Sequence, residues 1–234
     1  MTTEYQKLER EAERKSKHEA EREAIVYKTL EAGPKCLQKI KYPISRDTLV
    51  KQIIMLIKPS DEPRGYPLII GEHGTGKTSL ITLAVSGIKE SKGVAYVDVP
   101  DECESEVIIS QAMQKALGWS SVPVIDSEKR NYSSSLSISI ETNRFAAVFL
   151  GQVLEQFSNA AIRYKREHQK VPVLMIDYAN RLAQYRERLF DLIQDYAKRA
   201  PDNRITTVVF VSSEGRVPRR TMGMSVMFIV LFAR

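Results

Sequence analysis

A glycine-rich segment at residues 71–78 constrains this chain more than any other feature. It matches the pattern G-x-x-x-x-G-K-[ST] and consists of Gly71, Glu72, His73, Gly74, Thr75, Gly76, Lys77 and Thr78. An apolar run at residues 66–70 precedes it, and a helix-compatible run at residues 79–85 follows it. A strand, a glycine-rich loop and a helix in this order are typical of the phosphate-binding P-loop. The sequence therefore predicts that this segment binds the phosphates of a nucleotide.

The residue types in the segment have a chemical reason. Gly71, Gly74 and Gly76 allow backbone N–H groups to turn toward phosphate oxygens without a Cβ in the way, and the helix N-terminus adds partial positive charge. Lys77 is expected to reach the β- and γ-phosphates, and the hydroxyl of Thr78 to bind Mg²⁺. The residues predicted to bind the nucleotide are Gly71, Glu72, His73, Gly74, Thr75, Gly76, Lys77, Thr78 and Ser79.

A second apolar run, at residues 173–176, leads directly to Asp177. This is the Walker B pattern of hydrophobic residues followed by an aspartate. In a parallel sheet, the carboxyl end of such a strand lies beside the phosphate loop. We therefore predict that Asp177 and Thr78 together hold Mg²⁺, with Asp177 acting through water.

Strands and helices are expected to alternate along the chain. Apolar runs predict strands at residues 66–70, 94–99, 171–177 and 205–211. Amphipathic segments predict helices at residues 46–57, 78–90, 102–117, 143–168 and 182–199, with Ser45 as the cap of the first. The serine-rich residues 119–142 fit either a short edge strand or a mobile loop. Strands that are hydrophobic throughout indicate an α/β fold of three layers with a mostly parallel sheet.

The two ends of the sequence differ from the middle. Residues 4–32 are rich in Glu, Lys, Arg and Ala and predict a solvated helix outside the core, so we divide the chain into an extension (1–34) and a nucleotide-binding domain (35–234). Residues 222–234 are rich in β-branched and aromatic types. We expect a fifth strand there, beside the P-loop strand on the side away from the fourth strand. The alternative is an exposed, aggregation-prone end.

The composition excludes several other kinds of site. Cys36, Cys103 and three scattered histidines have no spacing for a disulfide framework or a zinc site. The sequence contains no run of 18 apolar residues, so we expect no membrane span. The polar N-terminus is unlike a secretory signal. Because 35 basic and 29 acidic residues are interleaved, the net charge of +6 predicts a solvated surface rather than a nucleic-acid interface. We expect a cytoplasmic protein, with the nucleus as the alternative, and a nucleotide ligand; a protein partner or self-association stays open.

The order of the strands resembles the additional-strand branch of the P-loop NTPases, and within it the AAA+ and STAND ATPases. The resemblance covers about residues 40–215. It implies an ATPase domain in which Lys77, Asp177 and Ser212 are catalytic, with Ser212 and Ser213 at the sensor-1 position that reads the γ-phosphate. Arg216 lies where a sensor or finger arginine could act. The alternative for the last three is an ordinary polar loop after a strand.

Two departures from these families bear on catalysis. The families usually place Glu or Asp directly after the Walker B aspartate, to polarise the attacking water, whereas Tyr178 follows Asp177 here. A tyrosine cannot replace a carboxylate base near pH 7. The candidates for the base are therefore Asp98, Asp101, Glu102 and Glu72. The second departure is that no helical lid, winged helix or repeat array follows the fourth strand in this sequence.

From these features we predict Mg²⁺-dependent ATP binding with slow hydrolysis at best, in the manner of a nucleotide switch. ATP is expected rather than GTP because the sequence contains neither the [NT]-K-x-D nor the D-x-x-G motif of guanine-nucleotide proteins. Two alternatives stay open. One is a module that binds nucleotide without turnover, and the other is a small-molecule or nucleotide kinase.

Overall fold

Five strands and seven helices make up the described part of the chain, which comprises residues 2–34, 46–88, 92–101, 106–119, 135–213 and 228–231 of the computed structural model. The strands are β1 (Leu68–Gly71), β2 (Val94–Asp98), β3 (Val173–Asp177), β4 (Thr207–Ser212) and β5 (Phe228–Leu231). The helices are α1 (Thr2–Ala32), α2 (Asp47–Ile57), α3 (Lys77–Gly87), α4 (Glu106–Ala116), α5 (Ser135–His168), α6 (Ala179–Tyr185) and α7 (Glu187–Asp202). Ser45, Glu102 and Arg216 lie outside the described residues.

The strands form one parallel sheet in the order β2-β3-β4-β1-β5. The predicted fifth strand is confirmed, because Phe228 pairs with Leu68 and Leu231 with Gly71 on the side of β1 away from β4. Parallel neighbours need crossover connections. Helix α3 lies between β1 and β2 in the sequence, α4 and α5 lie between β2 and β3, and α6 and α7 lie between β3 and β4. The carboxyl ends of β1, β4 and β3 therefore lie side by side along one edge of the sheet, where the predicted site residues are found.

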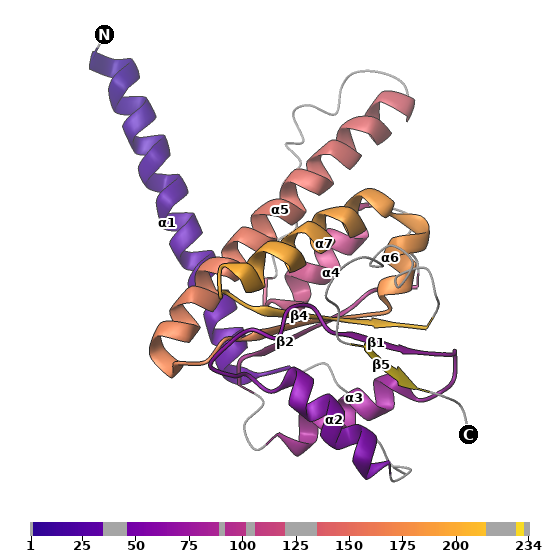
Figure 1. Ribbon diagram of the computed structural model, residues 1–234. Helices are drawn as coiled ribbons and strands as arrows, with labels where there is room; N and C mark the ends of the chain where they lie inside the picture. The colour runs from indigo at the N-terminus through magenta and orange to yellow at the C-terminus, as the bar shows by residue number, and fades with distance from the viewer. Residues whose placement is uncertain are drawn as a thin grey trace.

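Helices cover both faces of the sheet and give the molecule three layers (Figure 1). Helices α2 and α3 pack against one face, in a smaller core that contains Ile69 and Val209. The larger core, on the other face, joins α4, α5, α6 and α7 to Leu68 and Phe210. Successive side chains of a strand point to opposite faces, so the apolar runs of the strands fill both cores. The predicted three-layer α/β fold is confirmed.

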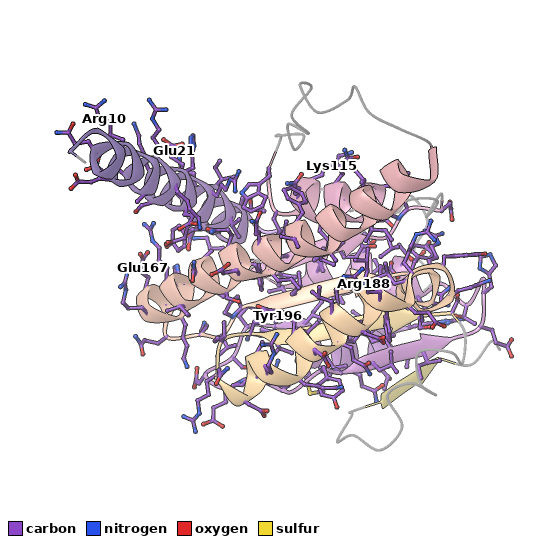
Figure 2. All side chains as sticks on the ribbon, turned by 90° about the horizontal axis from the view of Figure 1, so that it is seen from above. Arg10, Glu21, Lys115, Glu167, Arg188 and Tyr196 are labelled. Carbon is purple, nitrogen blue, oxygen red and sulfur yellow. The ribbon has the colours of Figure 1, made fainter. Side chains whose placement is uncertain are left out.

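Helix α1 has an exposed outer part and a buried inner end. The described side chains up to residue 21 are exposed, and Figure 2 shows Arg10 and Glu21 on the part of α1 that stands away from the other helices. Val26 and Leu30, by contrast, are fully buried in the larger core. The expectation of a helix outside the core is therefore wrong for the inner end, where two apolar residues four positions apart lie on one face. The division of the chain at residue 34 stays a prediction.

We expect Leu30→Ala to lower the free energy of unfolding by about 2–5 kcal/mol, because the substitution empties a fully buried position in the larger core. Ile25 lies on the same helix and is 40% exposed, so Ile25→Ala is the matched control and should cost about 1 kcal/mol or less. Chemical denaturation of both variants measures the difference. Equal, small losses would contradict a contribution of α1 to the core.

The serine-rich segment differs from both expectations in its second part. Residues 135–142 belong to α5 and form neither an edge strand nor a loop. The alternation of Leu136, Ile138 and Ile140 with serines has the period of two that is typical of a strand, but Leu136 and Ile140 are also four positions apart, which is the spacing of one helical face. Residues 120–134 lie outside the described residues.

The predicted helix over residues 182–199 is interrupted. Helices α6 and α7 are separated by Arg186, whose φ of −142° is not helical. The break ends the continuous helical stripe at that point. As a result Tyr185, which the periodicity predicts to face inward, is 52% exposed.

Candidate nucleotide-binding site

The P-loop joins the end of β1 to the start of α3. Gly74 and Gly76 both have a φ of +81°, a left-handed conformation that glycine adopts without strain. A Cβ at either position would meet nothing within 4 Å, so the backbone conformation, rather than crowding, is what requires glycine. An open loop of left-handed glycines at a helix N-terminus fits a phosphate group.

Lys77 is the first residue of α3 and is only 8% exposed. Its Nζ donates hydrogen bonds to the carbonyl oxygens of Gly71, at 2.7 Å, and Glu72, at 2.8 Å. Burial lowers the pKa of Lys77, and the negative charge of Asp177 opposes that shift. The backbone of the P-loop therefore holds the ammonium group of Lys77 close enough to Asp177 to interact with its negative charge.

Asp177, at the end of β3, is 1% exposed and accepts three hydrogen bonds. The hydroxyls of Thr78 and Tyr96 donate to Oδ2, at 3.0 Å and 2.7 Å, and the backbone N–H of Tyr178 donates to Oδ1 at 2.8 Å. Burial raises the pKa of Asp177, and these hydrogen bonds, that from Tyr96 most strongly, oppose the shift. The structure thus brings Thr78 and Asp177, the two residues predicted to hold Mg²⁺, into direct contact.

Ser212 ends β4, which lies between the P-loop strand and the strand of Asp177. It pairs in register with Ile70 and is fully buried. The backbone N–H of the next residue, Ser213, donates to Oδ1 of Asn180 at 3.3 Å and so connects the end of β4 to α6. Ser212 therefore lies at the same edge of the sheet as the P-loop and Asp177, and its role in reading the γ-phosphate stays a prediction.

The other residues predicted to bind nucleotide are arranged around Lys77 and Thr78. The hydroxyl and backbone N–H of Thr75, a buried residue, both donate to the carbonyl oxygen of Glu72, at 2.8 Å and 3.3 Å. The exposed members are Glu72, His73, Gly74 and Ser79. Nη1 of Arg46, just before α2, donates to the carbonyl oxygen of Thr75 at 3.0 Å. Arg46 belongs to a segment without a motif, so the sequence carries no sign of its contact with the P-loop.

Tyr178 stands where the related ATPases carry a carboxylate, and its φ of +57° is uncommon for a residue other than glycine. Its hydroxyl lies 3.4 Å from Oγ1 of Thr78, and the guanidinium carbon of Arg181 lies 3.8 Å from the centre of its ring. Arg181 also donates to the carbonyl oxygen of Val99 and pairs with Asp101. Tyr178 is thus held between the P-loop helix and the segment that follows β2.

The four candidate bases are Asp98, Asp101, Glu102 and Glu72. Asp98 pairs in register with Asp177 on the neighbouring strand, so the two side chains point to the same face, about 5 Å apart at the backbone. Desolvation, followed by the charge of Asp177, raises the pKa of Asp98. Asp101 is paired with Arg181. Asp98 and Glu72 are both exposed, but Glu72 lies in the P-loop and not on a strand beside Asp177. Asp98 is therefore the candidate base that the sheet places beside the predicted metal ligand.

Two other kinds of feature are absent from the described residues. They contain no group of three or more His, Cys, Asp or Glu side chains arranged to hold a metal ion. In the same part of the chain, no helix combines the length and the apolar character needed to cross a membrane.

Comparisons with known proteins agree with this architecture. Residues 60–215 match the family model of the AAA domain, and no curated protein matches the chain. A Walker-type ATPase of Pyrococcus abyssi has a similar fold, with a TM-score of 0.53 and 13% identity over 82% of this chain and 54% of its own. The Drosophila ORC bound to DNA has a TM-score of 0.51 and 16% identity over 91% of this chain and 46% of its own. The chain thus spans about half the length of each structure. Because the family match includes the P-loop and Asp177 and covers most of the sequence, this chain belongs to the AAA domain family of P-loop ATPases.

Proposed function

We propose that this AAA domain binds ATP together with Mg²⁺ and hydrolyses it slowly, as a nucleotide switch. The observation that carries the proposal is the meeting of Lys77, Thr78 and Asp177 at one edge of the sheet, with Thr78 hydrogen-bonded to Asp177 and Lys77 held by the P-loop backbone. An ammonium, a hydroxyl and a carboxylate are the groups that hold a phosphate chain and its Mg²⁺ in P-loop proteins. Membership of the family supports the use of nucleotide and of Mg²⁺.

Each residue has a distinct part in the proposed complex. Backbone N–H groups of the P-loop donate to the phosphate oxygens, and Lys77 transfers its hydrogen bonds from the carbonyl oxygens of Gly71 and Glu72 to the β- and γ-phosphates. Thr78 and Asp177 hold the metal ion, and Ser212 contacts the γ-phosphate. When bound, Mg²⁺ neutralises the charge on the phosphate oxygens.

Phosphate release by the purified protein, measured with ATP in the presence and absence of Mg²⁺, tests the proposal. Slow release that requires Mg²⁺ is the expected result. Binding without any release above background would instead support the alternative of a nucleotide-stabilised interaction module. ATP consumption only in the presence of a second, phosphate-accepting substrate would support a kinase.

The proposed slow turnover has a structural reason at Tyr178. The hydroxyl of Tyr178 lies beside Thr78, where a carboxylate would polarise the attacking water. A positioned general base contributes about 10²–10⁴-fold to a rate. We therefore expect Tyr178→Glu to raise the rate of phosphate release by at least about tenfold, while the dissociation constant for ATP changes little.

Tyr185→Glu is the matched control for this substitution, because it places the same new charge on an exposed tyrosine of the adjoining helix. It should leave the rate unchanged. Fast release by the wild-type protein would remove the reason for the substitution. If the wild type releases phosphate slowly and Tyr178→Glu does not raise the rate, the general base lies elsewhere. Asp98 would then be substituted first, because it pairs in register with Asp177.

The partner of the domain remains a separate part of the proposal. One neighbour in fold was solved bound to DNA, but a likeness at 16% identity supports only the shared fold. The interleaved charges of this sequence favour a protein partner or self-association over nucleic acid.

A further inference from the structure

Tyr96 is a buried tyrosine whose hydroxyl bonds to the predicted metal ligand. It lies in the middle of β2, where the neighbouring residues are apolar, and it is 3% exposed. Its ring belongs to the smaller core, together with Val173 and Met175. A buried phenol hydroxyl requires a hydrogen-bond partner. The hydroxyl of Tyr96 donates a hydrogen bond to Oδ2 of Asp177, at 2.7 Å.

The hydrogen bonds to Asp177 fix the orientation of its carboxylate. Tyr96 and Thr78 both donate to Oδ2, and the backbone N–H of Tyr178 donates to Oδ1. An ionised carboxylate has about four acceptor positions, two on each oxygen, so Oδ2 is filled and about one position of Oδ1 remains. Rotation of the carboxylate would break hydrogen bonds at both oxygens.

We propose that Tyr96 is a positioning residue of the metal site. Its hydroxyl holds Oδ2 of Asp177 toward the hydroxyl of Thr78 and leaves the remaining acceptor position of Oδ1 for the hydrated Mg²⁺ ion. Hydrogen-bond partners that orient metal ligands commonly determine metal affinity. This inference rests on the proposed function, since it assigns Asp177 to Mg²⁺.

The test uses Tyr96→Phe, which keeps the ring in the core and removes only the hydroxyl. Tyr196→Phe is the matched control. Tyr196, labelled in Figure 2, lies on α7 in the larger core, is 8% exposed and is hydrogen-bonded to Oγ of Ser158 at 3.0 Å. Both variants therefore lose the hydroxyl of a buried tyrosine, on opposite faces of the sheet. Asp177→Asn serves as the reference for a damaged metal site.

Calorimetry would measure two affinities for each protein. The first is the affinity for a non-hydrolysable ATP analogue in EDTA, and the second is the affinity of the protein–analogue complex for Mg²⁺. We expect Tyr96→Phe to weaken Mg²⁺ binding by about tenfold or more, with analogue binding in EDTA within about twofold of wild type. We expect Tyr196→Phe to change neither affinity.

Three other results would overturn the inference, and they are distinguishable. If Asp177→Asn weakens Mg²⁺ binding but Tyr96→Phe does not, the positioning role fails and the proposed function stands. If Tyr96→Phe weakens analogue binding equally with and without Mg²⁺, Tyr96 has only a general structural role. If the wild type binds no analogue, or binds it without any contribution from Mg²⁺ or Asp177, the proposed function fails and the inference fails with it.

Discussion

Lys77→Ala is expected to weaken ATP binding by about tenfold to a hundredfold. The lost contact is a charge-assisted hydrogen bond to phosphate, and such bonds contribute about 1.5–3 kcal/mol. The wild-type ammonium is already desolvated and already placed on the loop, with 8% of the residue exposed. Little ordering of the side chain is therefore needed when phosphate binds. Isothermal titration with MgATP measures the difference.

Two variants separate the loss of charge from other effects of this substitution. Lys77→Met keeps the aliphatic stem and removes only the ammonium group, so it should lose as much affinity as Lys77→Ala. Lys28→Ala removes an exposed lysine of α1 and should leave the affinity unchanged. Equal affinities of the wild type and both Lys77 variants would show that this loop does not bind the phosphates of ATP.

Removal of residues 224–234, which include β5, is expected to give insoluble protein. β5 pairs with β1 over four residues, from Leu68 to Gly71. Without it, the apolar P-loop strand becomes an edge with unpaired backbone groups, which is a template for association with other chains. The loss should far exceed that of a single helix cap, which is about 1 kcal/mol. The fraction of protein that stays in the supernatant after expression and centrifugation measures the effect.

The matched control for this deletion removes residues 2–20 from the exposed part of α1. Its described side chains are all exposed, so the shortened chain should stay soluble and bind nucleotide. If the deletion of residues 224–234 instead improved solubility and left nucleotide binding intact, β5 would have no structural role, and the alternative of an exposed, aggregation-prone end would be correct.

Local patterns were enough to predict most of the fold. Each strand is an apolar run, and the P-loop and Asp177 lie at the ends of two such runs. The contact between Thr78 and Asp177 spans 99 positions, yet it was predictable because both residues belong to motifs whose places in a parallel sheet are known. The place of β5 followed from the slot left beside β1 by the other strands.

The features that sequence analysis missed depend on contacts between distant segments without motifs. In the sequence, Tyr96 is one more residue of an apolar strand. Its hydrogen bond to Asp177 depends on the pairing of β2 with β3. Leu30 reads as an isolated leucine in a charged helix, because the core that covers it is built from helices later in the chain. The left-handed backbone of Tyr178 has no local signal either, since such a conformation in a residue other than glycine is maintained by its surroundings.

The place of β1 within the sheet also sets the order of events while the chain is being made. Both of its neighbours, β4 and β5, lie more than a hundred residues further along the chain, and β2, the next strand to leave the ribosome, pairs with β3 instead. The strand that presents the P-loop therefore has no partner until β4 has been synthesised, and pairing between such distant segments is slow. During that interval it is an apolar segment open to other chains, for which molecular chaperones provide protection. The nucleotide site can therefore form only after more than a hundred residues beyond the P-loop have been synthesised.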